Sequence, residues 1–257
     1  MNDLTWALSI PDGRTSLYCI AQAGFVVRSR AGTTLGVDLY LTDCVERFDG
    51  FKRLSPKVLR PDAVVLDGVA ATHWHLDHFD IDAMPLLLAN GRTRLLCAPD
   101  CRGHVEALHL DESRVTYLRY GDSAACGDIR LKAVFCDHGA GAPEAVGLVI
   151  EADGFKIYMA GDTALRLDKA PEIAAEGPFD VMIAPINGAF GNLNERENAE
   201  LCAFHRPKLS IPCHFWTFAE QHGDPGVYMD EMKKRLPAQK VLLMAPGERL
   251  ILQDAVR

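Results

Sequence analysis

THWHLDH, residues 72–78, carries three histidines and an aspartate that could bind a metal. The segment follows the apolar run AVVLDGVAA, residues 63–71, without a polar linker, so these side chains should emerge together at a strand end. Imidazole nitrogens and a carboxylate oxygen suit zinc and other first-row metals. Because burying so many ionisable groups is costly unless a cation compensates, the segment predicts a metal site.

Three later residues stand in the same context. His138 follows the segment IRLKAVFCD, Asp162 follows FKIYMAG, and His214 follows KLSIPC. Each alone is equally well explained as a turn residue or a histidine that bonds to the backbone. Together with the first segment they exceed the demand of one tetrahedral ion and predict two divalent ions. The candidate ligands are His73, His75, Asp77, His78, His138, Asp162 and His214.

Short apolar runs between turn residues predict a layered α/β fold with many strands. The clearest helix is expected at residues 194–205, where Asn194 and Glu197 have the spacing of a capping box. Two further helices are expected at residues 224–236 and between residues 80 and 90, and ADGF, residues 152–155, predicts a hairpin turn. The predicted strands are residues 25–29, 33–41, 63–71, 93–99, 129–136, 145–152, 155–160, 180–186, 207–212, 240–246 and 248–253.

Composition and length limit the number of domains and the kinds of binding partner that the chain can have. The chain has 257 residues, 48% of them hydrophobic, with no linker tract or internal repeat, so one domain over residues 1–257 is expected. A net charge of -8 disfavours a nucleic-acid partner. The sequence shows no signal peptide and no apolar run long enough to span a bilayer, which predicts a cytoplasmic protein without membrane insertion. Most of the eight scattered cysteines are expected to be reduced core residues. The sequence leaves open whether the chain forms a homo-oligomer.

The order of these motifs resembles the metallo-β-lactamase superfamily: THWHLDH, then His138, then AGDT with Asp162, then IPCHF with His214. The resemblance implies an αββα sandwich, in which two mixed β-sheets lie face to face with helices outside and metals at one edge. It also implies that His73, His75 and His138 bind one ion, that Asp77, His78 and His214 bind the other, and that Asp162 bridges them.

A narrower resemblance concerns residues 185–218, which contain ING, GNLN and IPCHF segments, and the GDP element at residues 223–225. They resemble the branch that contains L-ascorbate-6-phosphate lactonase, which implies hydrolysis of a small anionic lactone or ester. The expected mechanism is activation of water by two ions, zinc or manganese with iron as an alternative, with Asp77 and His214 as the catalytic residues beside the second ion.

The sequence is also compatible with other functions. The same dinuclear site could serve a phosphodiesterase acting on small molecules or phospholipid head groups, and a non-catalytic metal-binding module is a third class. The flavodiiron oxygen reductases share the fold, but their pattern has an acidic residue where this chain has His75. Length leaves no room for an added nucleic-acid-binding domain.

Residues with weaker signals are candidates for contacting the substrate or supporting the ligands. Asn187 could orient substrate or be a turn residue, and Trp216 could be a pocket wall or core. Arg166 could meet an anionic group of the substrate or be a solvated arginine. Asp38 resembles a strand-end aspartate that supports the metal ligands from below.

Overall fold

Two seven-stranded sheets form the centre of the computed structural model, which describes residues 4–10 and 12–256. The first sheet has the order β14-β1-β2-β3-β4-β5-β6 and the second has the order β13-β12-β11-β10-β9-β8-β7. Both sheets are mixed. In the first sheet, neighbouring strands from β1 to β3 are antiparallel and those from β3 to β6 are parallel. In the second sheet, neighbouring strands from β7 to β10 are antiparallel and those from β10 to β13 are parallel.

The strands are short and mostly buried. Those of the first sheet are β1 (Ser16–Ala21), β2 (Gly24–Arg28), β3 (Thr34–Val37), β4 (Gly68–Ala71), β5 (Arg94–Cys97), β6 (Val115–Tyr117) and β14 (Arg249–Ile251). Those of the second sheet are β7 (Ser123–Cys126), β8 (Ile129–Val134), β9 (Gly147–Ala152), β10 (Phe155–Met159), β11 (Val181–Pro185), β12 (Leu209–Cys213) and β13 (Lys240–Val241).

The sheets face each other across one apolar core. Phe25 and Val27 of β2 pack in the same buried cluster as Leu148 and Ile150 of β9 and Ile183 of β11. Side chains on the other face of each sheet belong to separate clusters that include the helices. Alternation along each strand therefore divides its side chains between the central core and an outer one.

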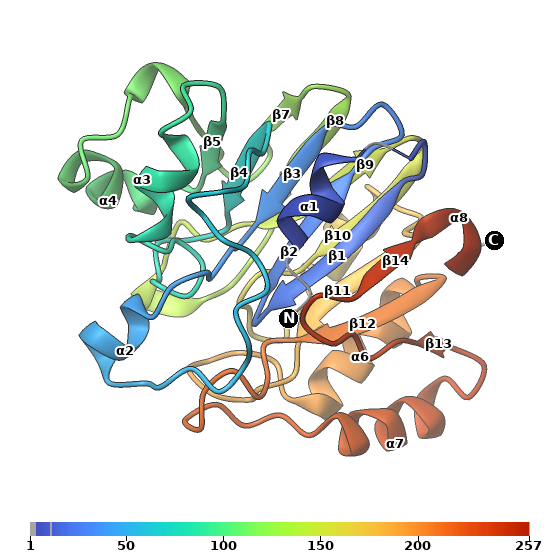
Figure 1. The fold of residues 1–257 in the computed structure, drawn as a ribbon. Helices are drawn as coiled ribbons and strands as arrows, with labels where there is room; N and C mark the ends of the chain where they lie inside the picture. Colours follow the sequence, from blue (N-terminus) through green and yellow to red (C-terminus); the bar gives the residue numbers. More distant parts are fainter. Residues whose placement is uncertain (1–3, 11, 257) are drawn as a thin grey trace.

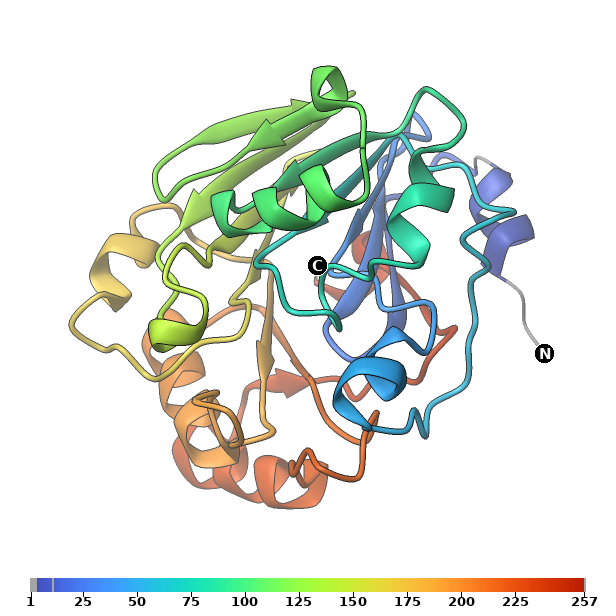
Figure 2. The same ribbon diagram turned by 90° about the vertical axis from the view of Figure 1, so that its left-hand side faces the viewer.

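Helices cover the outer faces, which confirms the αββα sandwich. On the first sheet α1, α3 and α4 share an apolar cluster with the strands, and on the second sheet α5, α6 and α7 do the same. Figures 1 and 2 agree that α3 and α4 lie apart from α6 and α7, on opposite sides of the sheets. The helices are α1 (Leu4–Ser9), α2 (Cys44–Asp49), α3 (Ala83–Leu88), α4 (Arg102–Ala107), α5 (Ala170–Ala174), α6 (Glu195–His205), α7 (Pro225–Arg235) and α8 (Leu252–Ala255). Short 3-10 turns occur at η1 (Pro99–Cys101), η2 (Glu112–Arg114) and η3 (Gly139–Gly141).

The predicted helices and hairpin are confirmed. Asn194 caps α6, with Glu197 completing the capping box, and Asp224 caps α7. The hairpin between β9 and β10 turns through Asp153 and Gly154, both of which have positive φ angles. Three strands were not predicted, namely β1, β6 and β7. Most predicted strands are shorter than expected, and the largest differences, of five residues each, occur in β3, β4 and β13.

The cysteines of the chain are free thiols, and all but the half-buried Cys136 are buried, as expected. Within the described residues, no helix combines the length and the apolar character that crossing a membrane requires.

Candidate metal centre

The candidate ligands follow strands whose carboxyl ends meet at one edge of the sandwich. The THWHLDH segment follows β4, His138 lies four residues beyond β8, Asp162 follows β10 and His214 follows β12 directly. Strands β8, β10 and β12 run in the same direction, because β9 is antiparallel to β8 and β10 while β11 is parallel to β10 and β12. Segments distant in the sequence therefore bring all seven predicted side chains together.

His73, His75 and His138 form the first group of ring nitrogens. The Nδ1 atom of His75 lies 3.0 Å from Nε2 of His73 and 3.1 Å from Nε2 of His138. Burial lowers the pKa of all three residues, that of His138 to about 4, so these imidazoles are neutral near pH 7. Three converging neutral nitrogens offer lone pairs, which is the donor set that a divalent first-row ion requires.

Asp77, His78 and His214 form the second group. Nε2 of His214 lies 3.2 Å from Nε2 of His78 and 3.3 Å from Oδ2 of Asp77. Burial opposes a charge on His214, but the carboxylates of Asp162 and Asp77 outweigh it and raise the pKa of His214 to about 9. In the absence of an ion this group therefore holds protons, which ion binding would displace.

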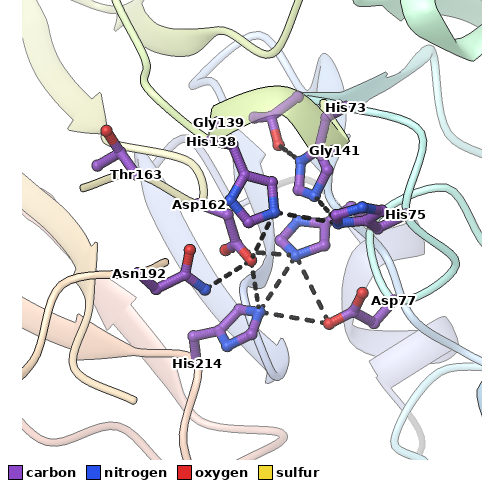
Figure 3. Close-up of polar contacts among 12 residues, drawn as sticks. His73, His75, Asp77, His138, Gly139, Gly141, Asp162, Thr163, Asn192 and His214 are labelled. Carbon is purple, nitrogen blue, oxygen red and sulfur yellow. Dashed lines mark hydrogen bonds and ion pairs between the residues drawn. The ribbon is translucent and has the colours of Figure 1, made fainter. Parts of the chain in front are cut away.

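Asp162 lies between the two groups (Figure 3). Its Oδ2 atom is 3.2 Å from Nε2 of His214 and 3.8 Å from Nε2 of His138, and its Oδ1 atom is 3.4 Å from Nε2 of His78. Oδ1 is buried and accepts no hydrogen bond from the described residues. A carboxylate that reaches both groups with an unpaired oxygen fits a pair of divalent ions that share it.

The turn that carries Asp162 requires a glycine. Gly161 has a φ of +66°, and a Cβ at this position would lie 3.0 Å from the carbonyl oxygen of Val146. Both the backbone angle and the close approach exclude larger residues without strain. The glycine of the AGDT motif thus holds Asp162 against the cluster.

Asp38 supports the cluster from the end of β3. It is 1% exposed, accepts hydrogen bonds of 2.8 Å from the backbone N–H and from the hydroxyl of Thr72, and places Oδ2 3.1 Å from Nδ1 of His78. A carboxylate on the far nitrogen of a histidine fixes the ring and directs its other nitrogen into the site. Asp38 thus occupies the supporting position predicted from the sequence.

We expect Asp38→Asn to lower metal affinity about 10- to 100-fold, because the amide would direct a donor at the His78 ring and disfavour its orientation. Competition with a chromophoric chelator measures this affinity. Asp67→Asn is the matched control, since Asp67 accepts the same pair of bonds, from the N–H and hydroxyl of Thr34, away from the cluster. Equal metal affinity in the two variants would contradict the supporting role of Asp38.

Two buried amides that the sequence did not single out also contact the cluster. Asn192 donates from Nδ2 to Oδ2 of Asp162 over 2.7 Å, and Gln22 donates from Nε2 to Oδ2 of Asp77 over 2.8 Å. Asn192 belongs to the quoted GNLN segment, but its amide has no sequence signal that separates it from a turn residue. Gln22 follows β1, a strand that is not among those predicted from the sequence.

Backbone angles around the cluster are unusual. Gln22, Asp38 and His214 have φ angles of 57°, 49° and 61°, in the left-handed region that non-glycine residues rarely occupy. Each is the first residue after a strand. Such conformations carry a cost of about 1–3 kcal/mol each and collect at functional sites.

A cavity of about 450 Å³ opens onto the cluster, and we call it the metal cavity. His75, Asp77, His138, Asp162 and His214 line one side of it. Val45, Phe51, Trp74, Phe190 and Phe218 form most of the rest, with the carboxylate of Asp49. None of its lining residues is a lysine or arginine.

The three residues predicted to contact substrate are not brought to this cavity. Asn187 is fully buried in an isolated β-bridge with Asn194, and its side chain donates weakly to the carbonyl of Ala189. Trp216 is 64% exposed and lines a different pocket. Arg166 lies at the surface, where Asp137 and Asp168 bind its guanidinium group over 2.7 and 2.8 Å. Its charge is already paired, so the solvated-arginine interpretation fits the structure.

The chain is similar to known proteins in sequence. The family model described as a beta-lactamase superfamily domain matches residues 39–215. A UPF0173 metal-dependent hydrolase of Thermococcus kodakarensis is 30% identical over 213 residues, covering 79% of this chain and 90% of that protein. Another from Staphylococcus aureus is 29% identical, covering 78% of this chain and 89% of that protein.

Similarity extends to solved structures. Igni18, a metallo hydrolase of the archaeon Ignicoccus hospitalis, has a TM-score of 0.70 and 20% identity, covering 92% of this chain and 97% of that one. At this identity the likeness supports the fold, and the family rests on the sequence matches. The chain belongs to the metallo-β-lactamase superfamily and, within it, to the UPF0173 family of metal-dependent hydrolases.

Proposed function

We propose that this chain holds two divalent ions, zinc or manganese, and hydrolyses the carboxylic ester bond of a small lactone or ester. The observation that carries the proposal is the position of Asp162, which contacts His138 of one group and His78 and His214 of the other. In this arrangement the first group would hold one ion, the second group would hold the other, and Asp162 would be a ligand available to both. Bound ions would supply a water of lowered pKa and a Lewis acid for the scissile carbonyl oxygen.

The residues of the chain then have separate tasks. Asp77 lines the metal cavity and belongs to the second group of candidate ligands. A bound cation would keep its carboxylate ionised, and from the cavity wall Asp77 can accept the proton of the attacking water and pass it to the leaving alkoxide. Gln22 holds Oδ2 of Asp77, which fixes the carboxylate at the cavity wall. His214 completes the second group and faces the same cavity.

The shape of the metal cavity supports a small substrate with an apolar body. Its volume of about 450 Å³ lies in the range of small-molecule sites. Phe51, Phe190 and Phe218 offer apolar surface to the part of the substrate that does not react. Because the lining has no lysine or arginine and includes Asp49, an anionic group distant from the metals would find no partner in this wall. We therefore propose an uncharged lactone or ester in place of the anionic one expected from the sequence.

The two alternative functions differ in what the cavity offers them. A phosphodiesterase would use the same donor set, but a phosphodiester brings a charge to a wall without lysine or arginine. A non-catalytic metal-binding module would not need an apolar cavity that opens onto the predicted ligands. The lactone or ester hydrolase uses both the cluster and the wall.

We expect the metal-loaded chain to hydrolyse dihydrocoumarin, an uncharged aryl lactone, with a kcat/KM about 100-fold above that for bis(p-nitrophenyl) phosphate. The physical reason is the match between the aromatic wall and the uncharged ring. A phosphorylated sugar lactone and its unphosphorylated counterpart, assayed on the same sample, measure the effect of a distal anion. The uncharged member of this pair should be the better substrate.

Each arm of this assay can contradict one part of the proposal. Preference for the phosphodiester would overturn the lactone or ester assignment while leaving the hydrolase intact. Preference for the phosphorylated lactone over its counterpart would show that the aromatic wall does not set the charge of the substrate.

A further inference from the structure

One amide in the wall of the metal cavity is not used by the described residues of the chain. It belongs to Gln221, which lines the cavity and is only 8% exposed. Its Oε1 atom is buried without a hydrogen-bond partner, and its Nε2 atom donates to no other described residue. Because polar groups this deeply buried are nearly always hydrogen-bonded, an unpaired amide at a cavity wall indicates a group that a ligand completes.

The nitrogen is the end of this amide that a ligand can reach. Oε1 has no accessible surface, whereas Nε2 is not among the buried atoms of the described residues that lack a partner. Since Nε2 also has no partner, it keeps accessible surface on a residue that lines the cavity. Exchanging the two ends of the amide would bury two unpaired donors in place of one acceptor, which disfavours the opposite orientation.

The segment that carries Gln221 is anchored on the cavity wall. The backbone N–H of Leu54 donates to the carbonyl of Thr217 over 2.7 Å. Phe218 is 1% exposed and packs on Tyr40, with ring centroids 5.4 Å apart. The backbone N–H of Gln221 in turn donates to the carbonyl of Phe218 over 3.3 Å. Gln221 therefore presents its amide from a fixed position, which selection of one substrate geometry requires.

The other polar side chains of the wall already have partners or tasks. The histidines that line the cavity, with Asp77 and Asp162, are candidate metal ligands. The indole N–H of Trp74 donates to the carbonyl of Gly141 over 2.8 Å, and the carboxylate of Asp49 can only accept. Outside the ligand set, Gln221 thus supplies the unengaged side-chain N–H donor of the described lining.

We propose that Gln221 is a specificity-determining residue, and that its Nε2 donates a hydrogen bond to an uncharged oxygen of the substrate that does not react. This inference rests on the proposed function and narrows the substrate class to uncharged lactones or esters with a further oxygen acceptor, such as a ketone, away from the scissile bond. A site with a buried donor rejects an isostere that lacks the acceptor, because the donor would then stay unpaired.

The test compares esters that differ in one oxygen. Phenyl 4-oxopentanoate and phenyl 4-methylpentanoate have the same number of heavy atoms, but only the first carries a ketone. Phenyl 5-oxohexanoate and phenyl 5-methylhexanoate form a second pair, in which the ketone lies one carbon farther from the scissile bond. With the metal-loaded chain, the keto ester of at least one pair should have a KM about tenfold below that of its methyl partner and a similar kcat, as one uniform hydrogen bond implies.

A binding measurement accompanies the kinetics. The anilides of the same four acids replace the ester by an amide that resists hydrolysis. Calorimetric titration of the metal-loaded chain should give the keto anilide of the same pair a Kd about tenfold below that of its methyl partner.

Variants assign the difference to one side chain. Gln221→Met removes the donor and keeps the length of the side chain, so both partners of each pair should agree within about twofold in KM and Kd. Gln221→Leu replaces it if that variant does not fold. Gln253→Met is the matched control, because Gln253 also has a buried Oε1 without a partner among the described residues, but donates to the hydroxyl of Thr15 and does not line the cavity. This control should keep the tenfold difference.

The proposal is overturned if wild type binds the keto and methyl anilides of both pairs equally, if the difference survives removal of the Gln221 amide, or if Gln253→Met abolishes it. Preferential binding of a keto anilide without hydrolysis of any ester would contradict the proposed function and support Gln221 as a ligand-binding residue. Hydrolysis of all four esters without preference would contradict the role of Gln221 and leave the proposed function intact.

Discussion

Replacing Asp162 with alanine is expected to lower kcat/KM by about 1000-fold or more, corresponding to about 4 kcal/mol of transition-state stabilisation. Asp162 contacts both groups of candidate ligands, so its loss disturbs both ions at once. The same variant should also bind fewer ions per chain, because the remaining histidines of the two groups no longer share a carboxylate. Steady-state kinetics and elemental analysis of the purified variant measure the two effects.

Control variants separate this effect from a general loss of structure. Asp180→Ala removes another buried carboxylate, which accepts from the backbone of Lys156 at the opposite end of β11, far from the cluster in the fold. Asn187→Ala and Trp216→Ala change residues that do not line the metal cavity. All three controls should keep kcat/KM within about tenfold of wild type. Turnover and metal content near wild type in Asp162→Ala would refute its role as the shared ligand.

Removing the metals is expected to abolish hydrolysis and leave the chain folded. Activity should fall at least about 1000-fold after chelation, because no serine or cysteine nucleophile lines the metal cavity. The fold should persist, since its three large apolar clusters do not contain the candidate ligands. A lower melting temperature without metal is expected, because ions that bind only the folded state stabilise it. Circular dichroism and activity, measured before and after return of zinc or manganese, check both parts. Full activity after exhaustive chelation would contradict the metal-dependent mechanism.

The ligand cluster could be predicted because its residues have distinctive chemistry in a repeated context. His73, His138, Asp162 and His214 each come after an apolar run, and apolar runs that become strands place the next residues of the chain at a sheet edge. Capping signals such as Asn194 and Glu197 are local, so the helix start they predict does not depend on the rest of the fold.

Other features could not be predicted because their meaning is set by distant segments. Gln22 resembles an ordinary turn residue until β1 places it beside Asp77 and His214. The sequence predicts one strand over residues 33–41, but β3 ends at Val37. Asp38 has a positive φ, which ends the extended backbone, and its carboxylate accepts a hydrogen bond from the backbone N–H of Thr72. The short strands β6 and β7 have half-exposed or small residues, which give little periodic signal.

The wall of the metal cavity was the part of the candidate site that the sequence indicated least. Arg166 is four positions after Asp162 in the sequence, but Asp137 and Asp168 hold it at the surface. The wall of the metal cavity instead comes from Phe51, Phe190 and Phe218, on loops whose positions depend on the packing of the whole sandwich. That residues 1–257 form one domain stays a prediction, as does the location of the protein in the cytoplasm.

Stepwise loading of the metal-free chain distinguishes two ions that act together from a single ion in this cluster. Manganese is added in fractions of an equivalent, while bound metal, lactone hydrolysis and the magnetic coupling between ions are measured on the same samples. We predict that binding saturates at two ions per chain, that full activity requires both, and that the loaded protein shows the spectrum of a coupled pair. Saturation and full activity at one ion per chain, with no coupled signal, would contradict it.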